Sequence, residues 1–232
     1  MLQAGLALRQ NLLNTAAAIL NRDAAGMTVR RDDIVEAASG KALLPLRELG
    51  RIVYFRPDTL PPGFTAEMMV TRHYAQRDYP FIFTNGVQAS YVEVDLDTGF
   101  VKLLKHWAVE DCGRVINPML VDEQMRGAIV QGIGGALYEE CLYDGAGQLL
   151  NGNMADYLVP MAGEMPDIVV AHVQTPTASS RLGAKGAGEA GTAGAPGAVM
   201  NAINDALRSQ GAAVFSQPFT PEKILRALGR VT

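Results

Sequence analysis

The chain has 232 residues, of which 48% are hydrophobic and 19% are charged, and its formal net charge is -4. This composition is typical of a folded globular protein and excludes a disordered chain. The slightly acidic balance disfavours a nucleic-acid-binding surface, which usually carries a basic excess. Because no run of about 18 apolar residues occurs, we expect no membrane span.

The N-terminal part predicts a helix followed by short strands and a second helix. Leucine and alanine recur near one helical face over residues 2–21. Residues 27–37 alternate weakly, as short strands do, and residues 46–55 favour a short helix. Prolines and a glycine then mark a connector at residues 57–63, after which residues 64–74 alternate again.

The middle of the chain predicts a β-hairpin followed by a glycine-rich helix. Residues 87–94 and 101–109 are predicted strands, and Asp97-Thr98-Gly99 between them is a hairpin turn signal. Asn117-Pro118 can start a helix, which we expect to run to about residue 140. Interior glycines cost a helix up to about 1 kcal/mol each, so four of them indicate close packing against another backbone or a ligand. These four are Gly127, Gly132, Gly134 and Gly135.

The C-terminal part predicts one more strand and two helices. Residues 168–173 form the predicted strand, residues 175–195 a loop of small residues, and residues 198–207 the last long helix. Thr220-Pro221 can cap and open a terminal helix. Hairpin-linked strands mixed with helices favour an α+β fold over a doubly wound sheet.

The sequence contains no visible internal repeat. We expect residues 1–232 to form one region, with a division into two subdomains, about 1–110 and 111–232, as the alternative. The first 20 residues lack a basic start and a clear cleavage site, so we expect no signal peptide. The two cysteines, Cys112 and Cys141, are expected to be reduced and buried in a cytoplasmic protein.

A single carboxylate, that of Glu189, lies in a run of glycine and alanine that extends to Gly197. Glycine allows the backbone to approach a ligand closely. The N-terminus of the helix that follows offers unpaired N–H groups, which suit anions. A carboxylate beside such a backbone-lined site is well placed to act as a general base.

Other interpretations of this segment lack the context they need. Gly186, Gly188 and Gly191 satisfy G-x-G-x-x-G, but the preceding strand ends near Val173 instead of running into the first glycine. The chain has no Gly-Lys-Ser/Thr of a P-loop, no G-x-S-x-G elbow and no zinc spacing. The three histidines favour structural or surface roles, and they are His73, His106 and His172.

Two sequence blocks together resemble one enzyme family. The first runs from Val92-Glu93-Val94-Asp95 through Glu110-Asp111-Cys112-Gly113-Arg114-Val115-Ile116-Asn117-Pro118 to Gln131-Gly132, and the second is Lys185-Gly186-Ala187-Gly188-Glu189 with the helix after it. In order and spacing they resemble the C-terminal part of the molybdopterin-binding large subunit of molybdenum hydroxylases, the family of xanthine dehydrogenase and aerobic carbon monoxide dehydrogenase. The motif Asp-Cys-Gly-Arg-Val-Ile-Asn-Pro resembles the carbon monoxide dehydrogenase branch of the family more closely than it resembles animal xanthine oxidase.

The resemblance implies an active site and its cofactor. Glu189 matches the glutamate that serves as general base when an aldehyde or N-heterocycle is hydroxylated with oxygen from water. Gln131 and Gly132 match the position that contacts the cofactor near the metal. The implied cofactor is molybdopterin, in the cytosine dinucleotide form, with molybdenum held by the pterin, so no protein metal ligand is expected. The residues that match the loop along the pterin are Lys185, Gly186, Ala187 and Gly188.

The resemblance also implies partners, because large subunits of this family are several times longer than 232 residues. We expect the missing N-terminal half of the large subunit, and iron–sulfur and flavin (FAD) subunits, on partner chains. The substrate is expected to be a small molecule, with aldehydes, N-heterocycles and carbon monoxide all open. The alternatives are a non-catalytic remnant or assembly module of this fold, and a nucleotide-binding module at residues 186–191.

Overall fold

The computed structural model describes residues 1–75 and 81–232, and the chain divides into two compact units, Met1–Gln76 and Arg77–Thr232. The alternative division expected near residue 110 falls inside strand β5 (Val101–Asp111). A hydrogen-bonded strand offers no linker at that position. No helix among the described residues is long and apolar enough to cross a membrane.

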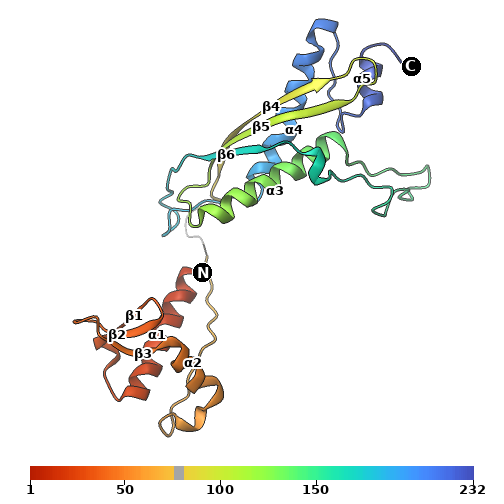
Figure 1. The fold of residues 1–232 in the computed structure, drawn as a ribbon. Coiled ribbons are helices and arrows are strands. Elements are labelled where there is room, and N and C mark those ends of the chain that lie inside the picture. The colour runs from red at the N-terminus through yellow and green to blue at the C-terminus, as the bar shows by residue number, and fades with distance from the viewer. Residues whose placement is uncertain (76–80) are drawn as a thin grey trace. The chain divides into compact units, whose positions relative to one another are not determined.

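The first unit combines two helices with a small antiparallel sheet (Figure 1). Its elements are α1 (Leu2–Leu20), β1 (Met27–Arg30), β2 (Asp33–Glu36), β3 (Ala42–Pro45) and α2 (Leu46–Phe55). Leu13, Ile34 and Leu49 are almost fully buried in its core. Both helices match the predicted bounds, whereas β3 was not predicted and residues 64–74 form no strand.

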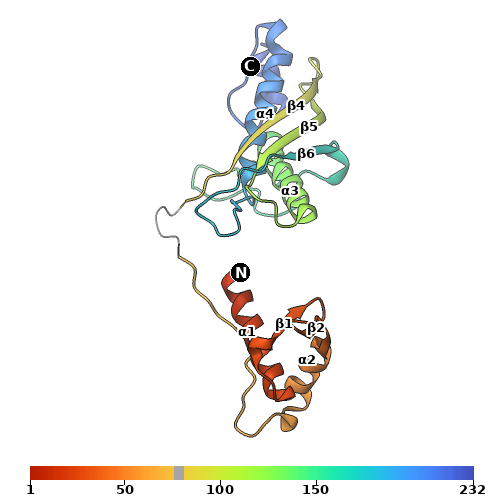
Figure 2. The same cartoon turned by 90° about the vertical axis from the view of Figure 1, so that its left-hand side faces the viewer.

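The second unit is built on a three-stranded sheet with α4 along one of its faces (Figures 1 and 2). Strand β4 pairs antiparallel with β5, which pairs in parallel with β6. Helix α3 packs against α4 and contacts β6. The elements are β4 (Asn85–Val94), β5, α3 (Pro118–Leu137), β6 (Ile168–His172), α4 (Ala190–Leu207) and α5 (Pro221–Ala227). The predicted α+β class is confirmed.

Alternation along the strands gives the sheet two different faces. The helix-facing side of β5 includes Leu103 and Ala108, which join the main core with Ile129 of α3 and Ile203 of α4. Side chains of the opposite face, such as Tyr91, remain largely exposed. Alternate residues of β4 from Gln88 onward therefore lie beneath the helices, as a period of two requires. In β5 a register shift opposite Tyr91 and Val92 resets the alternation, so that Leu103 and Ala108 share one face although they are five positions apart.

Helix α4 begins at Ala190, so the prediction that residues 175–195 form a loop was wrong for its last six residues. Gly191 and Gly194 in this stretch favoured a loop because glycine is a poor helix former. The helix forms because the small residues let it pack closely on α3. A Cβ at Gly191 would lie 2.8 Å from the carbonyl oxygen of Met125 and 2.9 Å from the backbone nitrogen of Ile129.

The four glycines of α3 divide into two pairs. A Cβ at Gly132 would lie 2.8 Å from the carbonyl oxygen of Thr192 in α4, and one at Gly134 would collide with the Glu139 side chain. Gly127 and Gly135 have no such neighbour within 4 Å. The prediction of close packing against another backbone is therefore confirmed for Gly132, whereas Gly134 packs against side chains. For the two open positions, packing against a ligand stays a prediction.

Residues 138–167 form an arm between α3 and β6 that has little regular structure. Cys141 lies near its start and is exposed, so the expectation that both cysteines are buried was wrong for this residue. Cys112, directly after β5, is only 4% exposed. Burial raises the pKa of the Cys112 thiol.

Candidate active site

The loop that carries Glu189 is fastened to the segment that follows β5. The backbone N–H of Lys185 donates to the carbonyl oxygen of Cys112 at 2.7 Å. Gly113 has a φ of 69°, and a Cβ there would collide with the carbonyl oxygen of Gly183. Glycine is thus required at this crossing both by conformation and by space.

Asp111 fixes the same loop through its carboxylate. The ammonium group of Lys185 lies 3.1 Å from Asp111 Oδ2, and the two side chains are 9% and 13% exposed. The backbone N–H groups of Gly113 and Thr175 donate to Oδ1 at 2.9 and 3.0 Å. The Thr175 hydrogen bonds, followed by those from Gly113 and Lys185, hold the pKa of Asp111 well below its usual range. The charge of Lys185 is therefore paired with the carboxylate of Asp111 in the same chain.

Glu189 is the N-cap residue of α4, with an exposed side chain that makes no capping hydrogen bond. Within residues 1–75 and 81–232 no hydrogen bond or ion pair engages its carboxylate. The preceding carbonyl, that of Gly188, accepts a hydrogen bond from Gln124 Nε2 at 3.0 Å. The backbone around Glu189 is thus held while its carboxylate is free to contact a ligand.

Gln131 lies beside the first turns of α4. The single proton of the Thr192 hydroxyl is shared between the carbonyl oxygen of Ala128 at 3.0 Å and Gln131 Oε1 at 3.3 Å. The side chain of Gln131 is exposed, whereas Gly132 is buried against α4. The fold thus brings Gln131 within one helical turn of Glu189 along α4, and places Gly132 in the interface between the two helices.

Open space surrounds the glycines of the loop. A Cβ at Gly186 or Gly188 would meet no atom within 4 Å. Among the described residues, no acceptor is bonded to the backbone N–H groups of Gly186, Ala187 and Gly188. Consecutive free N–H groups of this kind suit the oxygen atoms of an anionic ligand.

A buried polar network on the helix-facing side of the sheet was not predicted from the sequence. Its members are Ser90, His106, Gln88 and Glu110, joined by side-chain hydrogen bonds of 2.9, 3.1 and 3.3 Å in that order. His106 is 0% exposed, and burial lowers its pKa to about 4. Glu110 is 2% exposed, and burial raises its pKa. The only sequence signal was the occurrence of polar residues at inward-facing strand positions.

His172 of β6 joins the sheet to α3, because its Nε2 lies 2.6 Å from Asp122 Oδ1. Its Nδ1 is buried and has no hydrogen-bond partner among the residues that the structure describes. His73, the third histidine, is exposed in the first unit. The structure therefore gives His106 and His172 structural contacts, as the sequence favoured.

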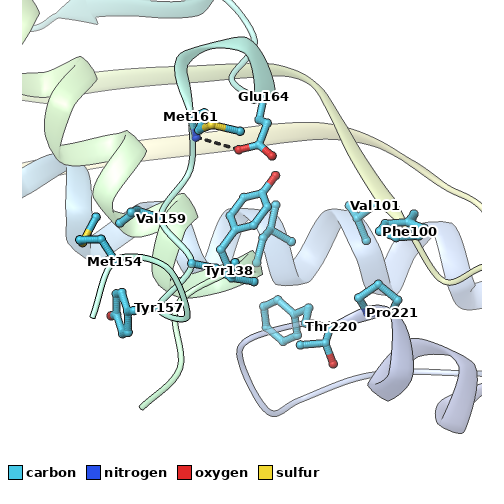
Figure 3. A pocket seen from close by; sticks show the side chains of 13 residues that line it. Phe100, Val101, Tyr138, Met154, Tyr157, Val159, Met161, Glu164, Thr220 and Pro221 are labelled. Atoms are coloured by element: carbon cyan, nitrogen blue, oxygen red, sulfur yellow. Dashed lines mark hydrogen bonds between the residues drawn. The ribbon is translucent and has the colours of Figure 1, made fainter. Parts of the chain in front are cut away.

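A cavity of about 660 Å³ lies between the arm, the β4–β5 turn and the start of α5 (Figure 3). Tyr138 stands in its wall with the hydroxyl group pointing toward Glu164. The Glu164 carboxylate accepts a hydrogen bond from the backbone N–H of Met161 at 2.7 Å. None of the predicted site residues lines this cavity, so it is separate from the loop of Glu189.

Comparisons with known proteins show what the chain as a whole resembles. Residues 1–166 match a family model described as molybdopterin cofactor-binding domain. The chain is 37% identical over 225 residues to the nicotine 6-hydroxylase large subunit of Paenarthrobacter nicotinovorans. The aligned region covers 97% of this chain and 27% of that relative. It is 30% identical over 175 residues to the carbon monoxide dehydrogenase large chain of Afipia carboxidovorans, covering 75% and 21% of the two chains.

A solved structure shows the same similarity in three dimensions. Quinoline 2-oxidoreductase from Pseudomonas putida 86 superimposes with a TM-score of 0.73 and 36% sequence identity, over 98% of this chain and 29% of that one. The chain thus spans between a fifth and a third of the length of the relatives it matches. The resemblance inferred from the two sequence blocks is confirmed.

Proposed function

This chain belongs to the molybdopterin cofactor-binding domain family, and we propose that it supplies part of a molybdenum hydroxylase active site with Glu189 as the general base. The reaction proposed is oxidative hydroxylation of a small molecule with water as the oxygen source. The observation that carries this proposal is the free carboxylate of Glu189 at the N-cap of α4, beside a loop with open glycines.

The loop residues fit the cofactor. Molybdopterin carries a phosphate and a polar heterocycle, and the loop offers free N–H groups at Gly186, Ala187 and Gly188 together with open space at both glycines. The pterin and its metal supply the two-electron oxidation when they are bound. The protein supplies a backbone held by the Lys185–Asp111 ion pair and a carboxylate that accepts a proton.

Each proposed contact has its own role. Gly186, Ala187 and Gly188 contact the cofactor through their backbones, and Lys185 acts by holding the loop in place. The exposed amide of Gln131 can both donate and accept hydrogen bonds. Gly132 contributes by letting α3 carry Gln131 close to α4. A positioned carboxylate base is typically worth about 10² to 10⁴ in rate.

The same proposal includes partners and further cofactors. Two relatives are named as a large subunit and a large chain, which supports assembly with other subunits. We propose that partner chains provide the rest of the large subunit, iron–sulfur clusters and FAD, that the cofactor is the cytosine dinucleotide form, and that the complex is cytoplasmic. Two similar proteins are named for nicotine and quinoline, which favours an N-heterocyclic substrate over an aldehyde.

The test is Glu189→Gln in the assembled complex. We expect molybdenum content to be unchanged and turnover of an N-heterocycle to fall by about 10² to 10⁴. Glu222→Gln is the matched control, because Glu222 is an exposed glutamate at the start of α5 in the same unit. Normal turnover by Glu189→Gln would remove the base assignment. Absence of molybdenum from the assembled wild-type complex would favour the non-catalytic assembly module instead.

A further inference from the structure

The side-chain amide of Gln88 lies between β4 and the first turn of α4. Its Nε2 is 3.0 Å from the carbonyl oxygen of Gly191, 3.3 Å from that of Ala190 and 3.3 Å from Glu110 Oε1. All three neighbours are acceptors, so the amide nitrogen must face them. The amide oxygen is then directed at His106 Nε2, 3.1 Å away.

This orientation fixes the direction of the remaining hydrogen bonds. His106 Nε2 must donate to Gln88 Oε1, so Nδ1 carries no proton and accepts from the Ser90 hydroxyl at 2.9 Å. A neutral imidazole is what full burial favours. The network therefore runs in one direction, from Ser90 through His106 and Gln88 to the backbone of α4, and every donor in it has an acceptor.

The first turns of α4 are confined on two sides at this point. A Cβ at Gly194 would lie 2.8 Å from Cδ of Gln88, and one at Gly191 would lie 2.8 Å from the Met125 carbonyl oxygen of α3. Glu189 is the N-cap of this helix and lies two residues before Gly191. A movement of the Ala190 carbonyl therefore moves the backbone that carries the Glu189 carboxylate.

Glu110 supports Gln88 from the neighbouring strand. Its carboxylate packs directly on Gly86, where any side chain would collide with it. Beside it lies a cavity of about 260 Å³, lined partly by Thr84 and Ala193. Gly86 thus offers a second way to disturb Gln88, because a methyl group there displaces the carboxylate without altering the amide.

We propose that Gln88 is a positioning residue that sets the location of Glu189 through its hydrogen bonds to the carbonyl groups of Ala190 and Gly191. The inference rests on the proposed function of Glu189. It adds a residue of β4, about a hundred positions earlier in the chain, to the groups on which catalysis depends. Small misplacements of a reacting group can cost about a hundredfold in rate.

The test compares Gln88→Leu with the wild-type complex in two measurements. Hydrogen–deuterium exchange should become faster at the amides of residues 190–197 and remain unchanged in α3 and α5. The rate at which substrate reduces the enzyme, expressed per bound molybdenum, should fall by about tenfold to a hundredfold with little change in KM. Gln210→Leu is the matched control, since Gln210 is an exposed glutamine in the same unit.

Two further variants separate positioning from general damage. Glu110→Gln keeps an oxygen that can accept from Gln88 Nε2, so α4 should retain its exchange pattern, whereas Gly86→Ala should loosen the start of α4 as Gln88→Leu does. In the Glu189→Gln background, Gln88→Leu should cause no further loss of rate, because both changes act through one carboxylate.

The outcomes distinguish this inference from the proposed function. If Glu189→Gln is inactive while Gln88→Leu retains the wild-type rate per molybdenum and the wild-type exchange pattern, the positioning role is wrong and the base assignment stands. If Gln88→Leu lowers the rate equally in the Glu189→Gln background, Gln88 acts elsewhere and the inference is also wrong. If Glu189→Gln turns over normally, the proposed function fails first, and the inference fails with it.

Discussion

The interface between α3 and α4 and the loop before α4 are both rich in glycine, for opposite reasons. At Gly132 and Gly191 a Cβ would lie 2.8 Å from backbone oxygens of the facing helix. At Gly186 and Gly188 it would meet nothing within 4 Å. In the first region the missing side chain is required by the packing of the chain itself, whereas in the second it leaves space that the chain does not fill.

This difference separates stability from function within one short sequence. The interface glycines let α4 form and hold its first turn, and the loop glycines leave backbone N–H groups accessible beside Glu189. Substitutions in the two regions should therefore have effects of different kinds. The following predictions are ordered by their expected effect on the free energy of unfolding.

The largest effect is expected from Gly191→Val. The new side chain would meet backbone atoms of Met125 and Ile129, which cannot move aside as a flexible side chain can. Overpacking of this kind costs about 1–3 kcal/mol where side chains can adjust, and because backbone atoms must shift here we expect a loss above about 3 kcal/mol. Denaturant unfolding of the purified chain measures the loss. A wild-type midpoint would show that the two helices are not in close contact.

Acidification should weaken the same packed region through His106. Burial lowers its pKa from 6.5 to about 4, so folding favours the neutral imidazole. This stabilising contribution is fully present above pH 6.5 and is lost as the pH falls from 6.5 toward 4. The total loss of unfolding free energy over that range is about 3 kcal/mol. Unfolding curves recorded across that range should show the loss in the wild-type chain, and His106→Gln should flatten the dependence. An unchanged pH profile in the variant would contradict a buried neutral histidine.

Gly197→Ala should stabilise the chain slightly. This glycine lies inside α4, as Gly191 does, but a Cβ at its position has no neighbour within 4 Å. Alanine is favoured over glycine in a helix by about 0.5–1 kcal/mol. A small increase in Tm beside the large decrease for Gly191→Val would sharpen the contrast between packed and open glycines within one helix.

The smallest effect on stability is expected from Gly188→Ala. Open space around this position predicts a change within about 0.5 kcal/mol, typical of surface substitutions. Molybdenum content of the assembled complex should nevertheless fall severalfold, because the methyl group occupies the space proposed for the cofactor. Unfolding and elemental analysis on the same preparation test both statements. A destabilised chain with normal molybdenum content would show that Gly188 is required for packing and not for binding the cofactor.

Local patterns were sufficient for much of the fold. The bounds of α2 and the turn at Asp97-Thr98-Gly99 follow from neighbouring residues, and the structure reproduces them. The start of α4 could not be predicted from neighbouring residues, because glycine has a low intrinsic helix propensity. The contacts that stabilise it come from α3, about 60 residues earlier in the chain.

From the residues alone, the candidate site could be predicted only where its members are contiguous, and the family resemblance added Gln131 and Gly132. Glu189 and its loop stand out as one segment, and two separated blocks led to the family. The partners of Gln88 lie 18, 22 and about 100 positions away, at His106, Glu110 and the start of α4. No sequence spacing encodes such a network, since each member is an ordinary polar residue until the sheet and α4 bring them together.

The difference in exposure between Cys112 and Cys141 allows one site to be labelled selectively without mutagenesis. One thiol is buried and its pKa is raised, whereas the other is exposed near the start of the arm. Because thiolates are the reactive form, a maleimide dye at neutral pH should attach at Cys141 alone. Fluorescence anisotropy or energy transfer from that dye would then report whether the arm changes when proposed partner chains are added.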